Sequence, residues 1–186
     1  LVFWGCKMDT IIIEKKSKYD IVGEKELKGF GFALKARNPK DKRESLKRVF
    51  IDDGLVICTD GSRLHIFATN LEIESGCYKV ISQKASQIVL KKDDCDFPDY
   101  KKVIPVPKWK STIACHGSHH SLFHEVYKNY ADDVASYNTD YLHDAYMENS
   151  SVSLYKEDRT WSPLVMYDND SRAAIVMPLK NNEKCN

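Results

Sequence analysis

The sequence lacks any long hydrophobic run: no apolar stretch approaches the ~20 residues that a membrane-spanning helix needs. It also lacks an excess of charge of either sign, because 28 lysines and arginines face 27 aspartates and glutamates, for a net charge of +1. So small a net charge excludes a polycation, and any contact with nucleic acid requires a locally basic face. The hydrophobic fraction of 42% and the charged fraction of 30% are typical of a soluble globular protein. A length of 186 residues suffices for one large core or two small ones.

Sequence motifs of common enzyme classes are missing as well. There is no Gly-x-Ser-x-Gly nucleophile motif and no glycine-rich phosphate-binding loop. The six cysteines form no Cys-x-x-Cys pair and are too sparse for a small disulfide scaffold. We therefore expect a non-enzymatic cytoplasmic protein without a cofactor, whose cysteines are mostly reduced structural thiols.

One histidine-rich segment leaves an enzymatic alternative open. His120 and His124 are four residues apart on an expected helix, the spacing at which two side chains can share a metal ion. His116 or Cys115 could add a third ligand, but the His-Glu-x-x-His order of metalloproteases is absent. A surface histidine patch is the simpler interpretation, and the alternative is a metal-dependent hydrolase built on His116, His120 and His124.

Hydrophobic periodicity predicts an α+β protein with antiparallel sheet, because short strands and amphipathic helices follow one another in blocks. The expected strands are 10–15, 48–52, 55–59, 77–81, 87–91, 111–115, 151–156, 163–167 and 172–177. Helices are expected at 24–37, over 122–130, and after an N-cap at Asn138 or Thr139. Residues 1–7 are interpreted as a remnant of expression or of upstream translation, and 181–186 as a frayed tail.

A Thr-Asp-Gly turn stands at the centre of this pattern. Residues 55–67 form two apolar runs that Thr59, Asp60 and Gly61 interrupt. Aspartate and glycine tolerate the positive φ that a tight turn needs. Arg63, just past the turn, is the polar exception in the stretch. Taken alone, these residues predict an ordinary hairpin with a surface arginine.

Three separate stretches together resemble one known family. They are TDGSRL at 59–64, FPDYKKVIP at 97–105, and YNTDYL at 137–142 followed by AIVMPLK at 174–180. In this order they resemble the bacterial DNA polymerase sliding clamp, the β subunit of the replicative polymerase. The resemblance covers roughly residues 48–180 with gaps, and the chain would be a shortened, clamp-like relative.

The resemblance implies the fold and the domain organisation. It predicts an α+β, DNA-clamp-like fold in which antiparallel sheets are backed by two or three helices and two halves are related by a pseudo-twofold axis. Because the chain is about half the length of a family chain, we expect one composite clamp-like domain over residues 8–180. Its first half is expected at 8–105 and its second at 106–180, with Pro105 and Pro107 at the boundary.

In the family, the three stretches line a cleft that binds short peptide motifs of polymerases and other clients. Carried over residue by residue, the cleft comprises Thr59, Gly61, Arg63, Leu64, Pro98, Lys102, Val103, Ile175, Met177, Pro178 and Leu179. Its aliphatic members would form a pocket for the apolar anchors of a client, and methionine suits an adaptable binding surface. Arg63 and Lys102 would form a polar rim for the client's backbone or acidic groups. Ser62 stands where the best-known members have histidine.

The family contacts DNA without sequence preference, through lysines and arginines on helices that face the channel. The candidates here lie on the first expected helix and are Lys25, Lys28, Lys35 and Arg37. A solvated helix face explains these four equally well, because two glutamates lie among them.

The resemblance thus implies a clamp-like accessory protein of DNA replication or repair. Such a processivity factor binds polymerase-type client peptides and contacts or encircles duplex DNA as a homo-oligomer, without a catalytic residue, a metal or a membrane. A second hypothesis keeps the cleft without the ring, as a monomeric adaptor or competitor for clamp clients. The third is the metal-dependent hydrolase of the His116–His124 segment.

Overall fold

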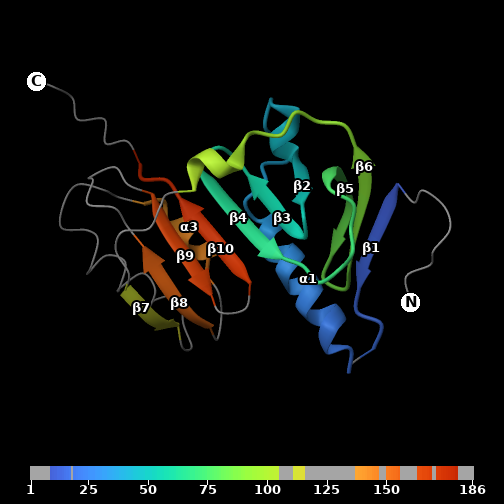
Figure 1. Cartoon of the computed structure of the whole chain (residues 1–186), viewed down its shortest axis with the longest axis horizontal. Helices are drawn as coiled ribbons and strands as arrows, with labels where there is room; N and C mark the ends of the chain where they lie inside the picture. The colour runs from blue at the N-terminus through green and yellow to red at the C-terminus, as the bar shows by residue number, and fades with distance from the viewer. Residues whose placement is uncertain are drawn as a thin grey trace, which may run out of the picture.

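The computed structural model describes residues 9–17, 19–104, 111–115, 137–146, 150–155, 163–168 and 171–179. Ten strands form one antiparallel sheet in the order β1-β6-β5-β2-β3-β4-β10-β9-β8-β7 (Figure 1). The strands are β1 (Thr10–Glu14), β2 (Arg48–Asp52), β3 (Leu55–Thr59), β4 (Arg63–Ala68), β5 (Gly76–Lys84), β6 (Gln87–Asp93), β7 (Ser111–Cys115), β8 (Ser150–Tyr155), β9 (Leu164–Asp168) and β10 (Arg172–Val176). The helices of the described part are α1 (Ile21–Leu34) and α3 (Thr139–Asp144), with the short 3-10 helices η1 (Glu44–Lys47) and η2 (Tyr100–Val103).

The sheet consists of two similar halves that meet at β4 and β10. In each half a strand and a helix precede a three-stranded meander: β1 and α1 before β2-β3-β4, and β7 and α3 before β8-β9-β10. β4 and β10 pair antiparallel with Leu64 opposite Ile175, so a pseudo-twofold axis passes between them. The β5–β6 hairpin, inserted between β1 and β2, departs from this symmetry. The predicted α+β fold with pseudo-twofold halves is confirmed, whereas the single domain over 8–180, divided after residue 105, stays a prediction.

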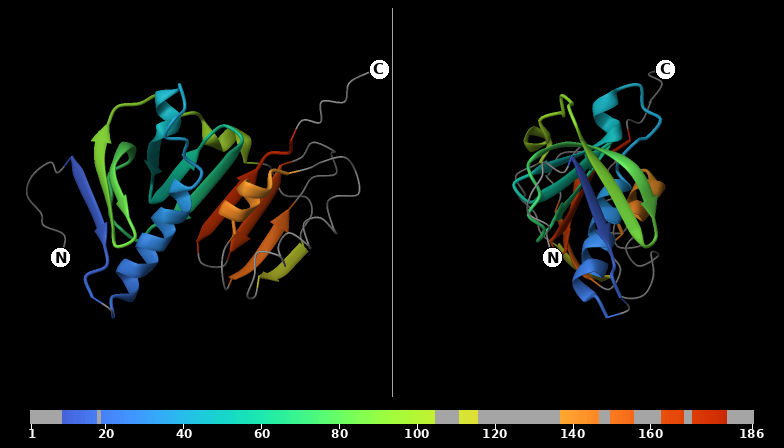
Figure 2. Two further views of the ribbon diagram at one scale, coloured as in Figure 1. Left: turned by 180° about the vertical axis from the view of Figure 1, so that it is seen from behind. Right: turned by 90° about the vertical axis from the view of Figure 1, so that its right-hand side faces the viewer.

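Both α-helices cover the same face of the sheet, as the left view of Figure 2 shows. Phe32 of α1 packs in one buried cluster with Leu142 of α3 and Ala174 of β10. We call this side of the sheet the helix face and the opposite side the outer face. Because successive side chains of a strand alternate between the two faces, each strand contributes to both.

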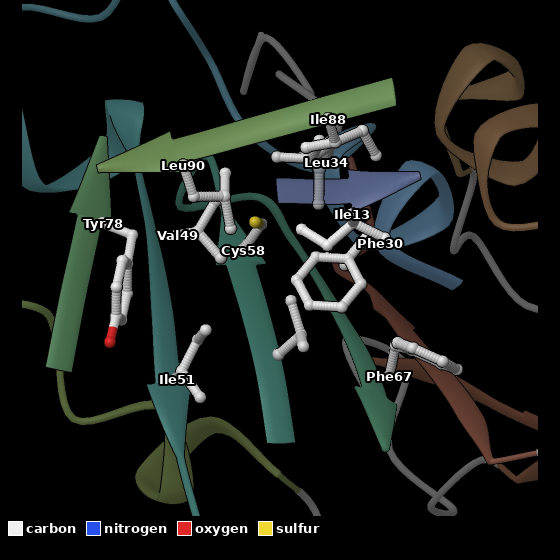
Figure 3. Close-up of a cluster of buried hydrophobic side chains, with 13 residues drawn as sticks. Ile13, Phe30, Leu34, Val49, Ile51, Cys58, Phe67, Tyr78, Ile88 and Leu90 are labelled. Carbon is white, nitrogen blue, oxygen red and sulfur yellow. The ribbon is translucent and has the colours of Figure 1, made fainter. Parts of the chain in front are cut away.

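The larger core lies on the helix face, between α1 and strands β1–β6 (Figure 3). Phe30 and Leu34 of α1 pack there against side chains such as Val49 of β2 and Phe67 of β4. Gly29 permits this approach, because a Cβ at this position would lie 2.2 Å from Cζ of Phe67. Glycine weakens a helix, and here the packing of α1 on β4 requires it.

α1 begins and ends about one turn earlier than the periodicity predicts. Asp20 caps the helix, and its carboxylate accepts a hydrogen bond from the backbone N–H of Gly23 at 2.9 Å. The expected start at residue 24 missed this cap. As a consequence Arg37 lies beyond the helix end, where it is half-buried and its Nη1 donates to the carbonyl of Lys47 at 3.4 Å.

The remaining expectations concern the strands and the later helices. The expected strands are present with shifted ends, and α3 begins after Asn138, whose side chain accepts from the N–H of Asp140 at 2.8 Å. The helix expected over 122–130 and the histidines His116, His120 and His124 lie outside the described residues. In the ranges that the structure describes, no helix has the length and hydropathy to cross a membrane.

The prediction of reduced cysteines is wrong for one pair, because Cys77 and Cys95 form a disulfide. The bond ties the segment after β6 to the beginning of β5. Sequence spacing does not predict this disulfide, because the two residues are 18 apart and come together only when the β5–β6 hairpin folds. Cys58 is free and fully buried, and burial raises the pKa of its thiol to about 12.

Candidate functional site

The Thr-Asp-Gly turn between β3 and β4 is held by its own side chains. The hydroxyl of Thr59 donates to the carbonyl of Arg63 at 2.6 Å and accepts from the N–H of Gly61 at 3.0 Å. The carboxylate of Asp60 accepts from the N–H groups of Ser62 at 2.8 Å and of Arg63 at 3.1 Å. Gly61 has a φ of +91°, which favours glycine. The predicted turn is therefore present and rigidly organised.

The turn lies directly beside the Met-Pro stretch that follows β10. Leu64 pairs with Ile175 and Arg63 with Val176 across the two strands. The N–H of Met177 then donates to the carbonyl of Ser62 at 2.9 Å, inside the turn itself. Two of the three stretches that carry the resemblance, far apart in the sequence, thus meet at one end of the sheet.

Residues 97–104, from the FPDYKKVIP stretch, cover the outer face next to this junction. Tyr100 of η2 packs in one buried cluster with Leu64, Ile175 and two neighbours, and Phe97 and Ile104 pack against it. In Figure 1 η2 is the short yellow-green helix at the end of the sheet where β4 begins. The Thr-Asp-Gly turn, residues 97–104 and the Met-Pro stretch therefore meet at this end of the outer face, whereas residues 137–142 lie on the helix face.

Side chains from β2 hold residues 97–104 in place. The ring of Phe97 stacks on Phe50 with 5.0 Å between centroids. The hydroxyl of Tyr100 donates to the carboxylate of Asp52 at 2.8 Å, and the ammonium of Lys101 lies 3.0 Å from it. Burial and the bond to Asp52 raise the pKa of Tyr100 to about 12, while Lys101 and Tyr100 together lower the pKa of Asp52.

The predicted cleft residues divide into a buried floor and an exposed rim. Thr59, Leu64 and Ile175 are buried. The exposed apolar side chains are Val103 at 48%, Met177 at 38% and Leu179 at 45% of their full accessibility. The other exposed members are Gly61, Pro98 and Lys102, Pro178 is half-buried, and Lys102 pairs with Asp99 at 3.2 Å. We call this set, without Arg63, the junction groove, after the cleft that the family resemblance implies.

Arg63 lies on the other side of the sheet. It adjoins Leu64 in β4, so its side chain points to the helix face while Leu64 points outward. Its guanidinium contacts the carboxylates of Asp60 at 3.0 Å and of Asp144 in α3 at 2.5 Å, and lies 4.4 Å from the ring centre of Tyr141. Only 11% of the side chain is exposed. Arg63 therefore links the turn to α3, which differs from the solvent-facing rim that the sequence predicted.

The helix face carries a broad concavity of about 1070 Å³ between α1, the β5–β6 hairpin and the second half. Three of the four predicted DNA contacts, Lys25, Lys28 and Lys35, line it. Lys84 and Arg172 add positive charge, and Glu24 is the one carboxylate among its lining residues, paired with Lys28 at 2.8 Å. Arg37 does not line the concavity.

The described residues contain no group of three histidine, cysteine, aspartate or glutamate side chains placed to hold a metal ion. His65 is fully buried under α1. Its Nδ1 lies 2.8 Å from the carbonyl of Phe32, and its ring stacks on that of Phe32 at 4.5 Å. Burial lowers the pKa of His65 to about 4, so the ring is neutral at pH 7.

Comparison with known proteins shows which solved structures share this fold. No protein-family model and no curated protein matches the sequence. Solved structures do match. The sliding clamp of Pseudomonas aeruginosa bound to griselimycin has a TM-score of 0.58 at 16% identity, covering 92% of this chain and 65% of that chain. The β subunit of DNA polymerase III from Borrelia burgdorferi, in complex with a natural product, has 0.58 at 14%, covering 92% and 64%. The sliding clamp of Bacillus subtilis has 0.60 at 10%, covering 92% and 64%.

The fold is that of a bacterial sliding clamp. The chain spans about two thirds of the length of the clamp chains that it matches. In this clamp fold the junction groove lies on the outer face and the lysine-lined concavity on the helix face.

Several residues around the groove, around Arg63 and in the concavity were not predicted from the sequence. Phe97, Tyr100 and Ile104 lie inside the FPDYKKVIP stretch, and the aromatic pair Phe97 and Tyr100 was the available signal for a buried support. Asp144 gave no signal, because its pairing with Arg63 joins residues 81 apart in the sequence. Lys84 and Arg172 were missed because they reach the concavity from other elements than α1.

Proposed function

We propose that this protein is a non-enzymatic, clamp-like accessory factor of DNA replication or repair that binds client peptides in the junction groove. The observation that carries the proposal is the convergence of the three stretches at one end of β4 and β10, with Met177 hydrogen-bonded to Ser62. Exposed apolar side chains around a firmly packed floor are the arrangement that apolar anchors of a linear peptide require. The proposed role places the protein in the cytoplasm with the DNA.

The clamps of similar fold add support. The Pseudomonas aeruginosa clamp was solved bound to griselimycin and the Borrelia burgdorferi one in complex with a natural product. Both are therefore clamps that hold small ligands. We assign ligand binding in this protein to the junction groove, because the apolar side chains of Val103, Met177 and Leu179 are exposed there.

Replacement of Met177 by alanine is expected to weaken peptide binding about tenfold, or ~1.4 kcal/mol, because a central apolar contact is removed. The fold should persist, since Met177 is 38% exposed. The measurement is fluorescence anisotropy with a labelled short peptide that contains two adjacent bulky apolar residues, with griselimycin as a second probe. Ile81→Ala is the matched control, because Ile81 is an exposed apolar residue on β5 outside the groove. Equal affinities of the wild type and Met177→Ala for both probes contradict the assignment.

The helix-face concavity is proposed as the surface that contacts duplex DNA. Its five cationic side chains against one carboxylate give the locally basic face that the near-neutral chain otherwise lacks. Contact with phosphates is independent of base sequence and is weakened by salt.

The triple variant Lys25→Gln, Lys28→Gln, Lys35→Gln should lose most of the DNA affinity. Each phosphate contact contributes about 0.9 to the slope of log K against log salt concentration, so the slope should fall by about 3. Titration of a labelled duplex at several salt concentrations measures this. Arg37→Gln is the control and should leave the slope unchanged, because Arg37 lies outside the concavity. An unchanged slope in the triple variant would show that the concavity does not contact DNA.

The monomeric adaptor is the second candidate. In the described part of the chain β1 and β7 end the sheet, and copies that pair through such edges would form the homo-oligomer that a ring requires. Light scattering distinguishes the two candidates, because a ring needs a closed oligomer at working concentration and the adaptor does not.

A further inference from the structure

A row of three cations crosses the outer face of the first half. Arg48 of β2 lies opposite Lys79 of β5, and Lys79 lies opposite Lys91 of β6. Like charges that are directly opposite on neighbouring strands destabilise a sheet. We call Arg48, Lys79 and Lys91 the cationic row.

The side chains of the cationic row project away from the helices. Their chain neighbours Val49, Tyr78 and Leu90 are buried in the core under α1, as Figure 3 shows. Because strand residues alternate, the three cations face the opposite side. That is the outer face, on which the buried residues Leu64 and Ile175 of the junction groove also lie.

The charges of the row are compensated at one end only. Arg48 contacts Asp93 at 2.6 Å and Glu44 at 3.2 Å, and 14% of its side chain is exposed. Lys79 and Lys91 are exposed. Within the described ranges no carboxylate lies within 4.0 Å of either ammonium group. Two adjacent positive charges therefore face the solvent without an acidic partner from the described chain.

The row leads toward the floor of the junction groove. Arg48 and Thr59 each lie two residues beyond the Phe50–Ile57 pair that joins β2 to β3. Thr59 is opposite Leu64, and Leu64 is opposite Ile175. Neighbouring strands are about 4.8 Å apart, so three strand steps, about 14 Å, separate Lys79 from Leu64. About four or five extended residues span that distance.

We propose that Lys79 and Lys91 bind acidic residues of the same client peptide whose apolar anchors fill the junction groove. This inference rests on the proposed peptide binding and specifies the client as apolar anchors joined to an acidic flank. The positive charges of Lys79 and Lys91 favour acidic residues in the flank. Because the cationic row continues into the groove floor, this acidic flank lies next to the apolar anchors. The repulsion between the two lysines is relieved when the acidic flank is bound.

The test compares labelled peptides with one pair of adjacent bulky apolar residues and a flanking run of either glutamates or glutamines, placed before the pair in one set and after it in another. In one of the two sets the glutamate peptide should bind the wild type about five- to tenfold more tightly at low salt, as expected for two partly exposed ion pairs. The difference should shrink at high salt, because exposed charges are screened. Lys79→Glu with Lys91→Glu should abolish the difference and leave the affinity for the glutamine peptide unchanged.

Lys16→Glu with Lys40→Glu changes the net charge equally at exposed positions outside the row and should retain the difference. Equal affinity of the wild type for the glutamate and glutamine peptides in both sets overturns this inference and leaves the groove intact. A difference that survives the row variant overturns it as well. If no peptide and no griselimycin binds, the proposed function fails, and this inference fails with it.

Discussion

Replacing Arg63 by methionine is expected to lower the free energy of unfolding by about 3 kcal/mol. The change removes the guanidinium that lies between Asp60 and Asp144 and leaves both carboxylates without it. Removing one partner of a largely buried ion pair typically costs 3–5 kcal/mol, and the 31% exposure of Asp144 moderates this value. Methionine retains the apolar stem, so the loss reports the charge and the stacking on Tyr141.

Urea unfolding at pH 7 measures this effect, with Arg43→Met as the matched control. Arg43 belongs to the loop that reaches the same turn and pairs with Asp41 at 3.0 Å, but 62% of its side chain is exposed. We expect this control to lose less than about 1 kcal/mol. Arg63→Lys should recover only part of the loss, because an ammonium cannot contact both carboxylates in the planar geometry of guanidinium. Equal stabilities of Arg63→Met and Arg43→Met would show that Arg63 does not link the two halves.

Acidification is expected to cost about 3 kcal/mol of stability through His65 alone. Its pKa is about 4 in the folded protein and near 6.5 when unfolded, because burial opposes protonation. Between pH 4 and pH 6.5 the unfolded state binds more protons than the folded state. The contribution of His65 to the free energy of unfolding is therefore complete above pH 6.5 and is lost as the pH falls toward 4. Arg63, Asp144 and Lys35 are the charged groups that act on the ring, and their effects are smaller than that of burial.

The variant His65→Asn tests this prediction, since its amide nitrogen lies near the position of Nδ1 and can still donate to the carbonyl of Phe32 but does not titrate. Urea unfolding of both proteins between pH 7 and pH 4 gives two stability curves. Other carboxylates such as Glu24 and Asp41, whose pKa values are lowered by Lys15 and Arg43, contribute equally to both curves. The difference between the curves should therefore narrow by about 3 kcal/mol toward pH 4. Parallel curves would show that His65 is not the buried neutral base.

Most of the fold could be predicted from local patterns, and its assembly could not. The Asp53-Gly54 turn between β2 and β3, with both residues at positive φ, follows directly from the sequence. The pairing of β4 with β10 joins residues more than 100 positions apart, and only the family resemblance pointed to it. The start of α1 was misplaced because the capping side chain of Asp20 was overlooked.

The candidate site was predictable at the level of segments and less so at the level of single side chains. The three stretches do converge, as the resemblance implied. The direction of Arg63, however, depends on strand register, because a shift of one residue exchanges the two faces of a strand. The disulfide of Cys77 and Cys95 and the cationic row also arise from pairing across strands, which sequence spacing alone does not show.

Hydrogen exchange of the full chain, with and without a saturating peptide that carries apolar anchors, tests whether the junction groove is one peptide-binding site. We expect slower exchange in three segments together, 59–64, 98–103 and 175–179, and no change in α1. Protection confined to α1 and the concavity, or protection of one segment without the other two, would show that the peptide does not bind in the junction groove.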